Sequence, residues 1–246
     1  QFQIFNPQIP RSMQHRNLGT SGLRVSVVGL GTNNFGGRLD VNQTRAVVDR
    51  AIDAGITLFD TADMYGNRGG SEEQLGEVLG ARRKDIVLAT KFAAPMDDSG
   101  RKVGASRRWI MEAVEDSLRR LKTDWIDLYQ LHFPDPLTPI EETLRALDDL
   151  ISQGKVRYIG CSNLSAWRVV ESQWVARDAE THRFVSCQEE YNILNRALEA
   201  DMLPAMAEYG CGLLPYFPLA SGLLTGKYKR EAMPAGARLT DTPKFA

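Results

Sequence analysis

The sequence predicts an α/β fold, a (β/α)8 barrel with an N-terminal β-hairpin, and three observations predict it. Short apolar segments alternate with amphipathic helical segments along most of the 246-residue chain. This alternation favours parallel strands joined by helices, and its repetition without a change in composition favours a closed barrel over an open sheet. The composition, 43% hydrophobic and 25% charged, is typical of one large globular domain.

The strands are predicted from short apolar runs that end at glycine, at a turn or at a polar residue. Two short strands around a glycine-rich turn at 14–25 are expected to form the hairpin that closes the bottom of the barrel. Seven buried parallel strands are expected after it. They are 26–31, 56–59, 85–91, 125–132, 155–160, 183–188 and 211–216.

The helices are predicted from apolar residues spaced three and four positions apart. In the first helix, 43–54, Asn42 is the expected N-cap and Val47, Ala51 and Ala54 form the expected inward face. Ser71 is expected to cap the second helix. The remaining helices are expected at 107–121, 139–152, 165–177 and 198–208.

The two ends of the chain are expected to lie outside complete barrel units. Residues 1–12 lack the apolar and basic features of a signal peptide and are interpreted as expression-derived residues or a loose arm. The segment after the seventh strand is rich in glycine and proline and offers no further strand. The expected domain is therefore 13–246, a single barrel that is C-terminally incomplete and lacks its eighth βα unit.

Composition also excludes several classes of function. The formal net charge of -1 does not indicate binding to nucleic acid or to an anionic membrane surface. No apolar run approaches the roughly 18 residues that a membrane span needs. Three cysteines without a CxxC pair indicate reduced thiols in a cytoplasmic protein, and no cluster has metal-ligand spacing. The sequence does not indicate an oligomeric state.

Three predicted strands end in a polar residue that shares a face with an apolar row. In a parallel barrel, reactive groups lie at the carboxyl ends of the strands, and side chains alternate along each strand. The rows are Ile56, Leu58 and Asp60; Val87, Ala89 and Lys91; and Ile126, Leu128, Gln130 and His132. The polar ends are therefore expected to meet at the mouth of the barrel.

These polar residues, with Tyr65 in the loop after the second strand, form a chemically coherent set. Asp60 and Lys91 are expected to form an ion pair. Lys91 is expected to lower the pKa of the Tyr65 hydroxyl towards neutral pH. His132 is expected to orient a carbonyl oxygen. The set predicts a proton-donor site for carbonyl reduction, with the hydride supplied by a cofactor.

Six segments in order then resemble one family. They are FDTADMYGNRGGSEEQLG, LATKF, LYQLHFPDP, GCSN, QEEYN and PYFPLASGLLTGKY, and they are similar to motifs of the aldo-keto reductase superfamily, in its bacterial and potassium-channel β-subunit branch. The resemblance implies a (β/α)8 barrel that binds NADP(H) over its mouth without a Rossmann fold. It implies the catalytic set Asp60, Tyr65, Lys91 and His132, and a small carbonyl compound as substrate.

The resemblance also implies cofactor-binding residues. Ser162, Asn163 and Gln188 would hold the nicotinamide carboxamide, Tyr216 would stack on the ring, and Gly31 and Thr32 would form the floor beside it. The loop 217–227 would cover the pyrophosphate. It includes Phe217, Pro218, Leu219, Ser221, Gly222 and Lys227.

Two departures from the family pattern concern the phosphates. Phe217 replaces a small polar residue, which removes one side-chain contact. The adenosine and 2′-phosphate site of the family follows the eighth strand, so that the preference for NADP(H) over NAD(H) is implied by the family alone.

Two alternative functions remain open at this point. One is a non-catalytic, NADP(H)-binding regulatory subunit that reports redox state. The other is a Schiff-base aldolase with Lys91 as nucleophile, which an adjacent Asp60 disfavours because it keeps the lysine charged. The sequence does not name the substrate, although Phe35, Phe92 and Phe133 indicate an apolar pocket. Trp109 is expected to lie on a helix exterior.

Overall fold

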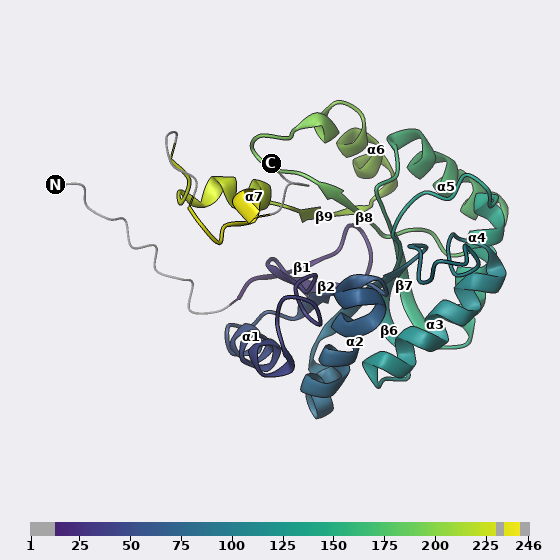
Figure 1. The fold of residues 1–246 in the computed structure, drawn as a ribbon. Helices are drawn as coiled ribbons and strands as arrows, with labels where there is room; N and C mark the ends of the chain where they lie inside the picture. Colours follow the sequence, from purple (N-terminus) through teal and green to yellow (C-terminus); the bar gives the residue numbers. More distant parts are fainter. Residues whose placement is uncertain (1–12, 230–233, 242–246) are drawn as a thin grey trace.

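The structure is a computed structural model that describes residues 13–229 and 234–241. Its centre is one parallel sheet in the order β3-β4-β5-β6-β7-β8-β9, so that each strand pairs with its neighbours in sequence. The strands are β3 (Gly29–Gly31), β4 (Leu58–Asp60), β5 (Val87–Phe92), β6 (Ile126–Leu131), β7 (Val156–Ser162), β8 (Ser186–Glu190) and β9 (Gly212–Tyr216). The sheet curls into a half-barrel (Figure 1), which confirms the predicted fold class.

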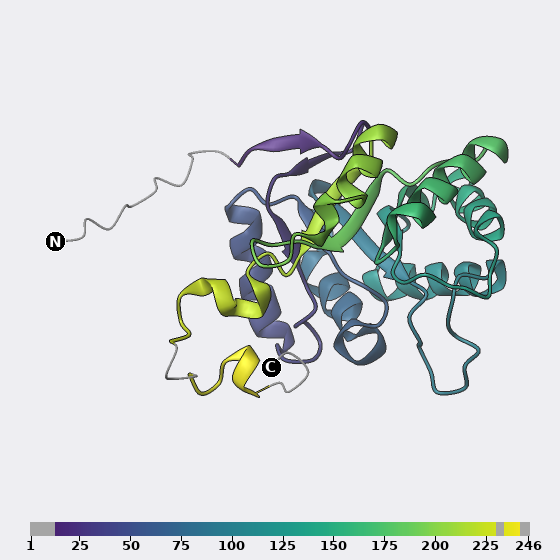
Figure 2. The ribbon, with the colours of Figure 1, turned by 90° about the horizontal axis from the view of Figure 1, so that it is seen from above.

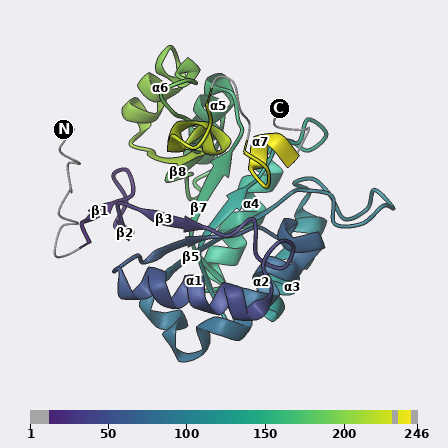
Figure 3. The same ribbon diagram turned by 60° about the vertical axis from the view of Figure 1, so that its left-hand side comes forward.

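Helices cover the outer face of the curled sheet (Figure 1), as expected for right-handed βαβ connections. They are α1 (Val41–Asp53), α2 (Tyr65–Leu79), α3 (Arg107–Leu121), α4 (Ile140–Ser152), α5 (Ala166–Asp178) and α6 (Met202–Tyr209). Short 3-10 helices η1 (Gly80–Asp85), η2 (Ala197–Glu199) and η3 (Ala220–Thr225) and a last helix α7 (Arg238–Asp241) complete the described chain. Figure 3 shows α1 and α2 side by side on one flank of the sheet.

A hairpin of β1 (His15–Asn17) and β2 (Arg24–Ser26) precedes the sheet, as predicted. Its residues Leu18, Leu23 and Val25 pack on the apolar row inside the half-barrel. The tip is anchored by the Thr20 amide, which donates to the carbonyl of Gly210 just before β9. The hairpin therefore covers the amino ends of the strands, on the opposite side of the molecule from η3 and α7 (Figure 2).

The strand register supports the inward face predicted for β4, β5 and β6. Asp60 pairs with Gly31 on one side and with Ala89 on the other, and Ala89 pairs in turn with Leu128. Leu58, Ala89 and Leu128 belong to the inner cluster with the hairpin, while Phe59 and Leu88 pack on the helices outside. This parity directs the polar residues at the strand ends to one mouth.

Two details of the predicted helices were wrong. Asp40, not Asn42, caps α1, because its side chain accepts from the Gln43 amide while the Gln43 side chain bonds back, which forms a capping box. The buried face of α1 is Thr44, Val48 and Ala51, so that of the three predicted residues only Ala51 points inward.

The described residues cover only part of what was predicted for the two ends of the chain. Residues 1–12, the predicted arm, lie outside the described residues. No eighth parallel strand occurs in 13–229 or 234–241. Within the same ranges, no helix has the length and apolar character that crossing a membrane requires.

Candidate active site

The carboxyl ends of β4 and β5 bring Asp60, Lys91 and Tyr65 together at the mouth. Lys91 Nζ lies 2.7 Å from Asp60 Oδ2 and 3.4 Å from the Tyr65 hydroxyl, and it donates to the Thr61 carbonyl at 2.8 Å. The Lys91 side chain is completely buried. All three donors of the ammonium are therefore directed by the protein, and one of them points at the phenol.

Asp60 is held by amides as well as by the ammonium. Its Oδ1 accepts from Gln130 Nε2 at 3.0 Å and from Gln188 Nε2 at 2.9 Å. These donors come from β6 and from β8 on the far side of the half-barrel. The Asp60 carboxylate thus holds the Lys91 ammonium with one oxygen, while its other oxygen accepts from the two glutamine amides.

Lys91 is protonated at neutral pH, but its effect on the pKa of Tyr65 is smaller than the sequence suggested. Burial lowers the pKa of Lys91, yet Asp60 and Tyr65 more than offset this, so that its pKa is raised overall. Burial raises the pKa of Tyr65, Lys91 lowers it and Asp60 raises it, and the result is a raised pKa. The predicted shift of Tyr65 towards neutral pH was therefore wrong, and the residue is a protonated phenol at neutral pH.

His132 follows β6 and lies beside Tyr65, with the two rings edge to face and their centroids 5.7 Å apart. Burial and the nearby Lys91 ammonium lower the pKa of His132 to about 3, which makes the ring neutral at neutral pH. Its Nδ1 is buried and has no hydrogen-bond partner. A neutral imidazole can donate one hydrogen bond to a carbonyl oxygen without competing for the proton of Tyr65.

A left-handed turn follows Tyr65 and sets its position. Gly66, Asn67, Arg68 and Gly69 all have positive φ, and only after them does α2 become regular. A Cβ at Gly66 would lie 2.4 Å from the Phe35 carbonyl oxygen, so that the close approach of the two loops requires glycine there. Asn67 and Arg68 carry backbone strain of about 1–2 kcal/mol each. Strain of this kind is concentrated at functional sites in proteins.

Ser71 of α2 also helps to hold the segments around Tyr65 in place. The sequence predicted a helix cap, but its hydroxyl instead donates to the Thr32 carbonyl at 3.0 Å and bonds the Thr61 hydroxyl at 2.9 Å. The Thr32 hydroxyl donates to the Asp60 carbonyl at 3.0 Å. These buried hydroxyls join the ends of β3 and β4 to α2.

The residues expected to hold a nicotinamide carboxamide lie on the other side of the mouth. Asn163 Nδ2 donates to the His132 carbonyl and to Ser162 Oγ, both at 3.0 Å, and Asn163 Oδ1 accepts from the Tyr216 hydroxyl at 2.8 Å. The Ser162 hydroxyl donates to the Gln188 carbonyl at 2.7 Å. The structure therefore connects all four expected residues in one network, with Asn163 at its centre.

Space is open at Gly31, at the end of β3. A Cβ built on Gly31 would meet no atom within 4 Å, although its strand partner is Asp60. Thr32 next to it is buried and its hydroxyl is used within the protein. Gly31 thus fits the expected floor of a ring site, whereas the Thr32 side chain supports that floor from behind.

The loop expected to cover the pyrophosphate runs from β9 into η3. Phe217, Ala220 and Ser221 have positive φ, as does Gly222. The Phe217 carbonyl accepts from Asn192 Nδ2 at 3.1 Å, which ties the start of the loop to the segment after β8. Pro218, Leu219 and Lys227 are exposed.

Most aromatic residues expected in a substrate pocket do not line the mouth. Phe35 and Phe92 are buried in the two outer clusters, and Trp109 is buried rather than exterior. Phe133 alone of the four is exposed, and it stacks on His132 with the centroids 4.3 Å apart. Apolar residues at strand ends were ambiguous because either face of a parallel strand is packed.

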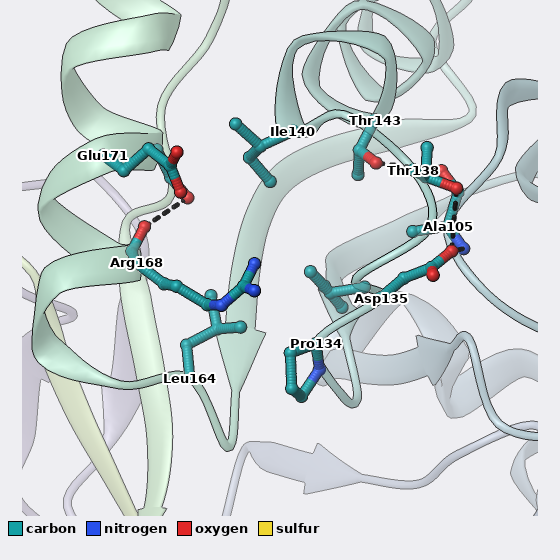
Figure 4. A pocket seen from close by; sticks show the side chains of 11 residues that line it. Ala105, Pro134, Asp135, Thr138, Ile140, Thr143, Leu164, Arg168 and Glu171 are labelled. Carbon is teal, nitrogen blue, oxygen red and sulfur yellow. Dashed lines mark hydrogen bonds between the residues drawn. The ribbon is translucent and has the colours of Figure 1, made fainter.

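A small cavity lies near the mouth but outside the barrel, between the loop after β6 and α5 (Figure 4). Arg168 of α5 points into it across from Pro134 and Asp135. Its volume of about 20 Å³ has room for little more than a water molecule. None of Asp60, Tyr65, Lys91 and His132, the tetrad expected to be catalytic, lines this cavity, so that the cavity is separate from their site.

Sequence reasoning missed two supporting residues. Gln130 bonds Asp60, and its position two residues before His132 on the same strand face was a usable signal. Asn192 holds Phe217, and no local pattern marks this contact because 25 residues separate the two. In the part of the chain that the structure describes, no group of histidine, cysteine, aspartate or glutamate residues could hold a metal ion.

Comparison with known proteins gives consistent matches over nearly the whole chain. The model of the aldo/keto reductase family matches residues 27–243. The chain is 41% identical to a probable voltage-gated potassium channel subunit beta of Oryza sativa subsp. japonica over 235 residues, 92% of this chain and 70% of the relative. It is 39% identical to aldo-keto reductase YhdN of Bacillus subtilis (strain 168), covering 95% of this chain and 70% of the relative. It is also 37% identical to versiconal hemiacetal acetate reductase of Aspergillus parasiticus, covering 86% and 69%.

Proposed function

The chain belongs to the aldo/keto reductase family, and on this premise we propose that it is an enzyme that reduces aldehydes or ketones to alcohols with NADPH. The observation that carries the proposal is the buried Lys91 ammonium, held between the Asp60 carboxylate and the Tyr65 hydroxyl. The three cysteines are free thiols, which fits a reducing cytoplasm.

Each residue of the tetrad has a role that follows from its surroundings. Tyr65 is protonated and gives its proton to the carbonyl oxygen as negative charge develops there. The Lys91 ammonium stabilises the phenolate that remains, and Asp60 keeps the ammonium in place. Neutral His132 donates a hydrogen bond to the same oxygen and orients the carbonyl.

The residues at the mouth fit a nicotinamide cofactor, which when bound supplies the hydride. Gly31 leaves room beside Asp60, the partly exposed Tyr216 offers a ring face, and the Asn163 network provides amide groups next to it. The backbone of the loop 217–227 and Lys227 would bind the pyrophosphate. The preference for NADPH over NADH rests on the family resemblance.

The proposal is tested by the substitution Tyr65→Phe, which removes the transferred proton and keeps the ring. We expect turnover of activated aldehydes to fall by about 100-fold or more. NADPH affinity, measured by cofactor fluorescence, is expected to stay within about threefold of the parent. Tyr158→Phe is a matched control, because Tyr158 packs on the inner cluster near the hairpin, at the other end of the barrel. Near-normal reduction by Tyr65→Phe would remove Tyr65 from its role.

A regulatory subunit is the second candidate, because one relative is a probable voltage-gated potassium channel subunit beta. Both candidates bind the cofactor, but only an enzyme turns over a panel of aldehydes at rates that depend on Tyr65. A Schiff-base aldolase fits less well, since the pKa of Lys91 is raised and its ammonium is bonded by Asp60.

A further inference from the structure

Glu72, at the start of the regular part of α2, carries a fully buried carboxylate that the proposed reaction does not use. Its Oε1 accepts from the Thr90 hydroxyl at 2.5 Å, and its Oε2 accepts from Arg120 Nε at 2.7 Å. Thr90 is also fully buried, and the Arg120 side chain is only 9% exposed. Desolvation of a buried ion pair costs about as much as the attraction between its charges returns. Stability alone is therefore a weak explanation for this pair.

The Glu72 carboxylate joins three elements of the fold on the outer face of the sheet. Side chains alternate along β5, so Thr90 points outward while its neighbour Lys91 points into the barrel, where it bonds Asp60. Glu72 thus attaches α2 to β5 at the residue before Lys91, and Arg120 attaches α3 to the same carboxylate. The contact therefore sets where α2 lies relative to the strand that carries Lys91.

Arg120 also packs against the left-handed turn that follows Tyr65. A Cβ on Gly69, the last residue of that turn, would lie 2.6 Å from Arg120 Cδ. The stem of the arginine therefore fills the space beside the turn, while its guanidinium bonds Glu72 three residues further along α2. A strained turn keeps its shape only if its surroundings hold it. Arg120 and Glu72 together form such surroundings on the side of α3.

The segment that carries Tyr65 is attached to β5 on both sides of the tyrosine. Before Tyr65, the Asp63 amide donates to the Lys91 carbonyl at 3.2 Å. After Tyr65, Glu72 accepts from Thr90. Between these two attachments, the Tyr65 hydroxyl lies 3.4 Å from Lys91 Nζ, which is close to the limit of a hydrogen bond. A small displacement of the segment would therefore break the contact between the phenol and the ammonium.

We infer that Glu72 is a positioning residue, which fixes the segment carrying Tyr65 against β5 so that the phenol stays within reach of the Lys91 ammonium. Arg120 balances the charge of the carboxylate and holds its orientation. Hydrogen bonds to a carboxylate are charge-assisted and about twice as strong as neutral ones. The inference rests on the proposed function for the reaction that it serves, but the link between α2 and β5 does not depend on that reaction.

Two substitutions of Thr90 separate its hydroxyl from its shape. Thr90→Val keeps the branched side chain and leaves Glu72 Oε1 buried without its donor, whereas Thr90→Ser keeps the hydroxyl and loses a methyl group. Thr44→Val is a matched control, because the fully buried Thr44 of α1 donates to Gln74 Oε1 of α2 at 2.7 Å. It removes the same kind of bond from α2 on the side away from β5. We expect both valine variants to lose about 2–6 °C in melting temperature.

The link is tested first without any cofactor, by hydrogen exchange of the free protein. We expect the amides of residues 66–71 to exchange about tenfold faster in Thr90→Val than in the parent, because the turn opens more often when Glu72 loses its bond to β5. In Thr90→Ser and in Thr44→Val, the same amides should exchange within about threefold of the parent. Equal exchange of these amides in Thr90→Val and Thr44→Val would overturn the link.

The positioning role is tested next by steady-state reduction of an activated aldehyde with NADPH. We expect kcat of Thr90→Val to fall by about tenfold, while KM and NADPH affinity stay within about threefold of the parent. Thr90→Ser and Thr44→Val should keep kcat within about threefold. A packing role for Thr90 predicts the reverse order, because valine preserves its shape better than serine.

An unchanged kcat in Thr90→Val, or an equal fall of kcat in Thr44→Val, would contradict the positioning role. If the parent itself reduced no aldehyde, the proposed function would fail and the positioning role with it. Hydrogen exchange of residues 66–71 would then still decide whether Glu72 holds the turn against β5.

Discussion

The stability of the folded protein should depend on Lys91 and Asp60 as an ion pair, and not on each charge separately. Lys91→Met removes the ammonium and leaves the Asp60 carboxylate with only the two glutamine amides. Loss of one partner of a buried ion pair costs about 3–5 kcal/mol. Because the Asp60 side chain is 18% exposed and keeps both amides, we expect the lower end, about 3 kcal/mol. For a chain of this length the melting temperature should fall by about 6–12 °C.

The double variant Asp60→Asn, Lys91→Met removes both charges and retains an oxygen that accepts from Gln130 and Gln188. We expect it to recover at least half of the lost free energy of unfolding, because no uncompensated charge is left. The assay is urea unfolding of the parent, of Lys91→Met and Asp60→Asn as single variants, and of the double variant, all at neutral pH. A loss below about 1 kcal/mol in Lys91→Met, or a double variant as unstable as the sum of the single ones, would refute the reasoning. Both Lys91 variants should lose aldehyde reduction.

Two further predictions concern the backbone around the mouth. Gly31→Leu should fill the open space beside Asp60 and weaken NADPH binding by about tenfold or more. The melting temperature of the free protein should stay close to that of the parent. Unchanged affinity would show that the cofactor does not use this space. Arg68 has φ of 66°, a conformation that is strained for any residue with a side chain. Arg68→Gly should therefore be more stable than Arg68→Ala by about 1 kcal/mol, because both variants lose the contact with Asp98 but only glycine relieves the strain. Equal unfolding free energies of the two variants would contradict this.

The fold was predictable because the pattern that encodes it is local. Strand and helix segments follow from apolar periodicity, and the shared parity of Asp60, Lys91 and His132 placed them at one mouth. The pKa of Tyr65 was not predictable, since it depends on burial as well as on Lys91 and Asp60. The left-handed turn after Tyr65 was missed although Gly66, Asn67 and Gly69 are residue types that readily adopt positive φ, because Arg68 among them is not.

Contacts between distant segments could not be predicted from the sequence either. The resemblance implied that Asn163 binds a cofactor, but not that its side chain bonds the His132 carbonyl and the Tyr216 hydroxyl. Buried aromatic residues such as Trp109 could not be assigned to core or pocket from spacing alone. These features are set by tertiary packing, which periodicity does not encode.

We propose that Tyr65 protonates a carbonyl oxygen whose carbon receives a hydride from NADPH. The most direct measurement uses NADPH deuterated at the transferred position, an activated aldehyde, and mass analysis of the alcohol formed by the parent and by Tyr65→Phe. We expect one deuterium on the carbinol carbon with the parent, and alcohol formed about 100-fold more slowly or not at all with Tyr65→Phe. Alcohol without deuterium, or equal rates with both proteins, would contradict it.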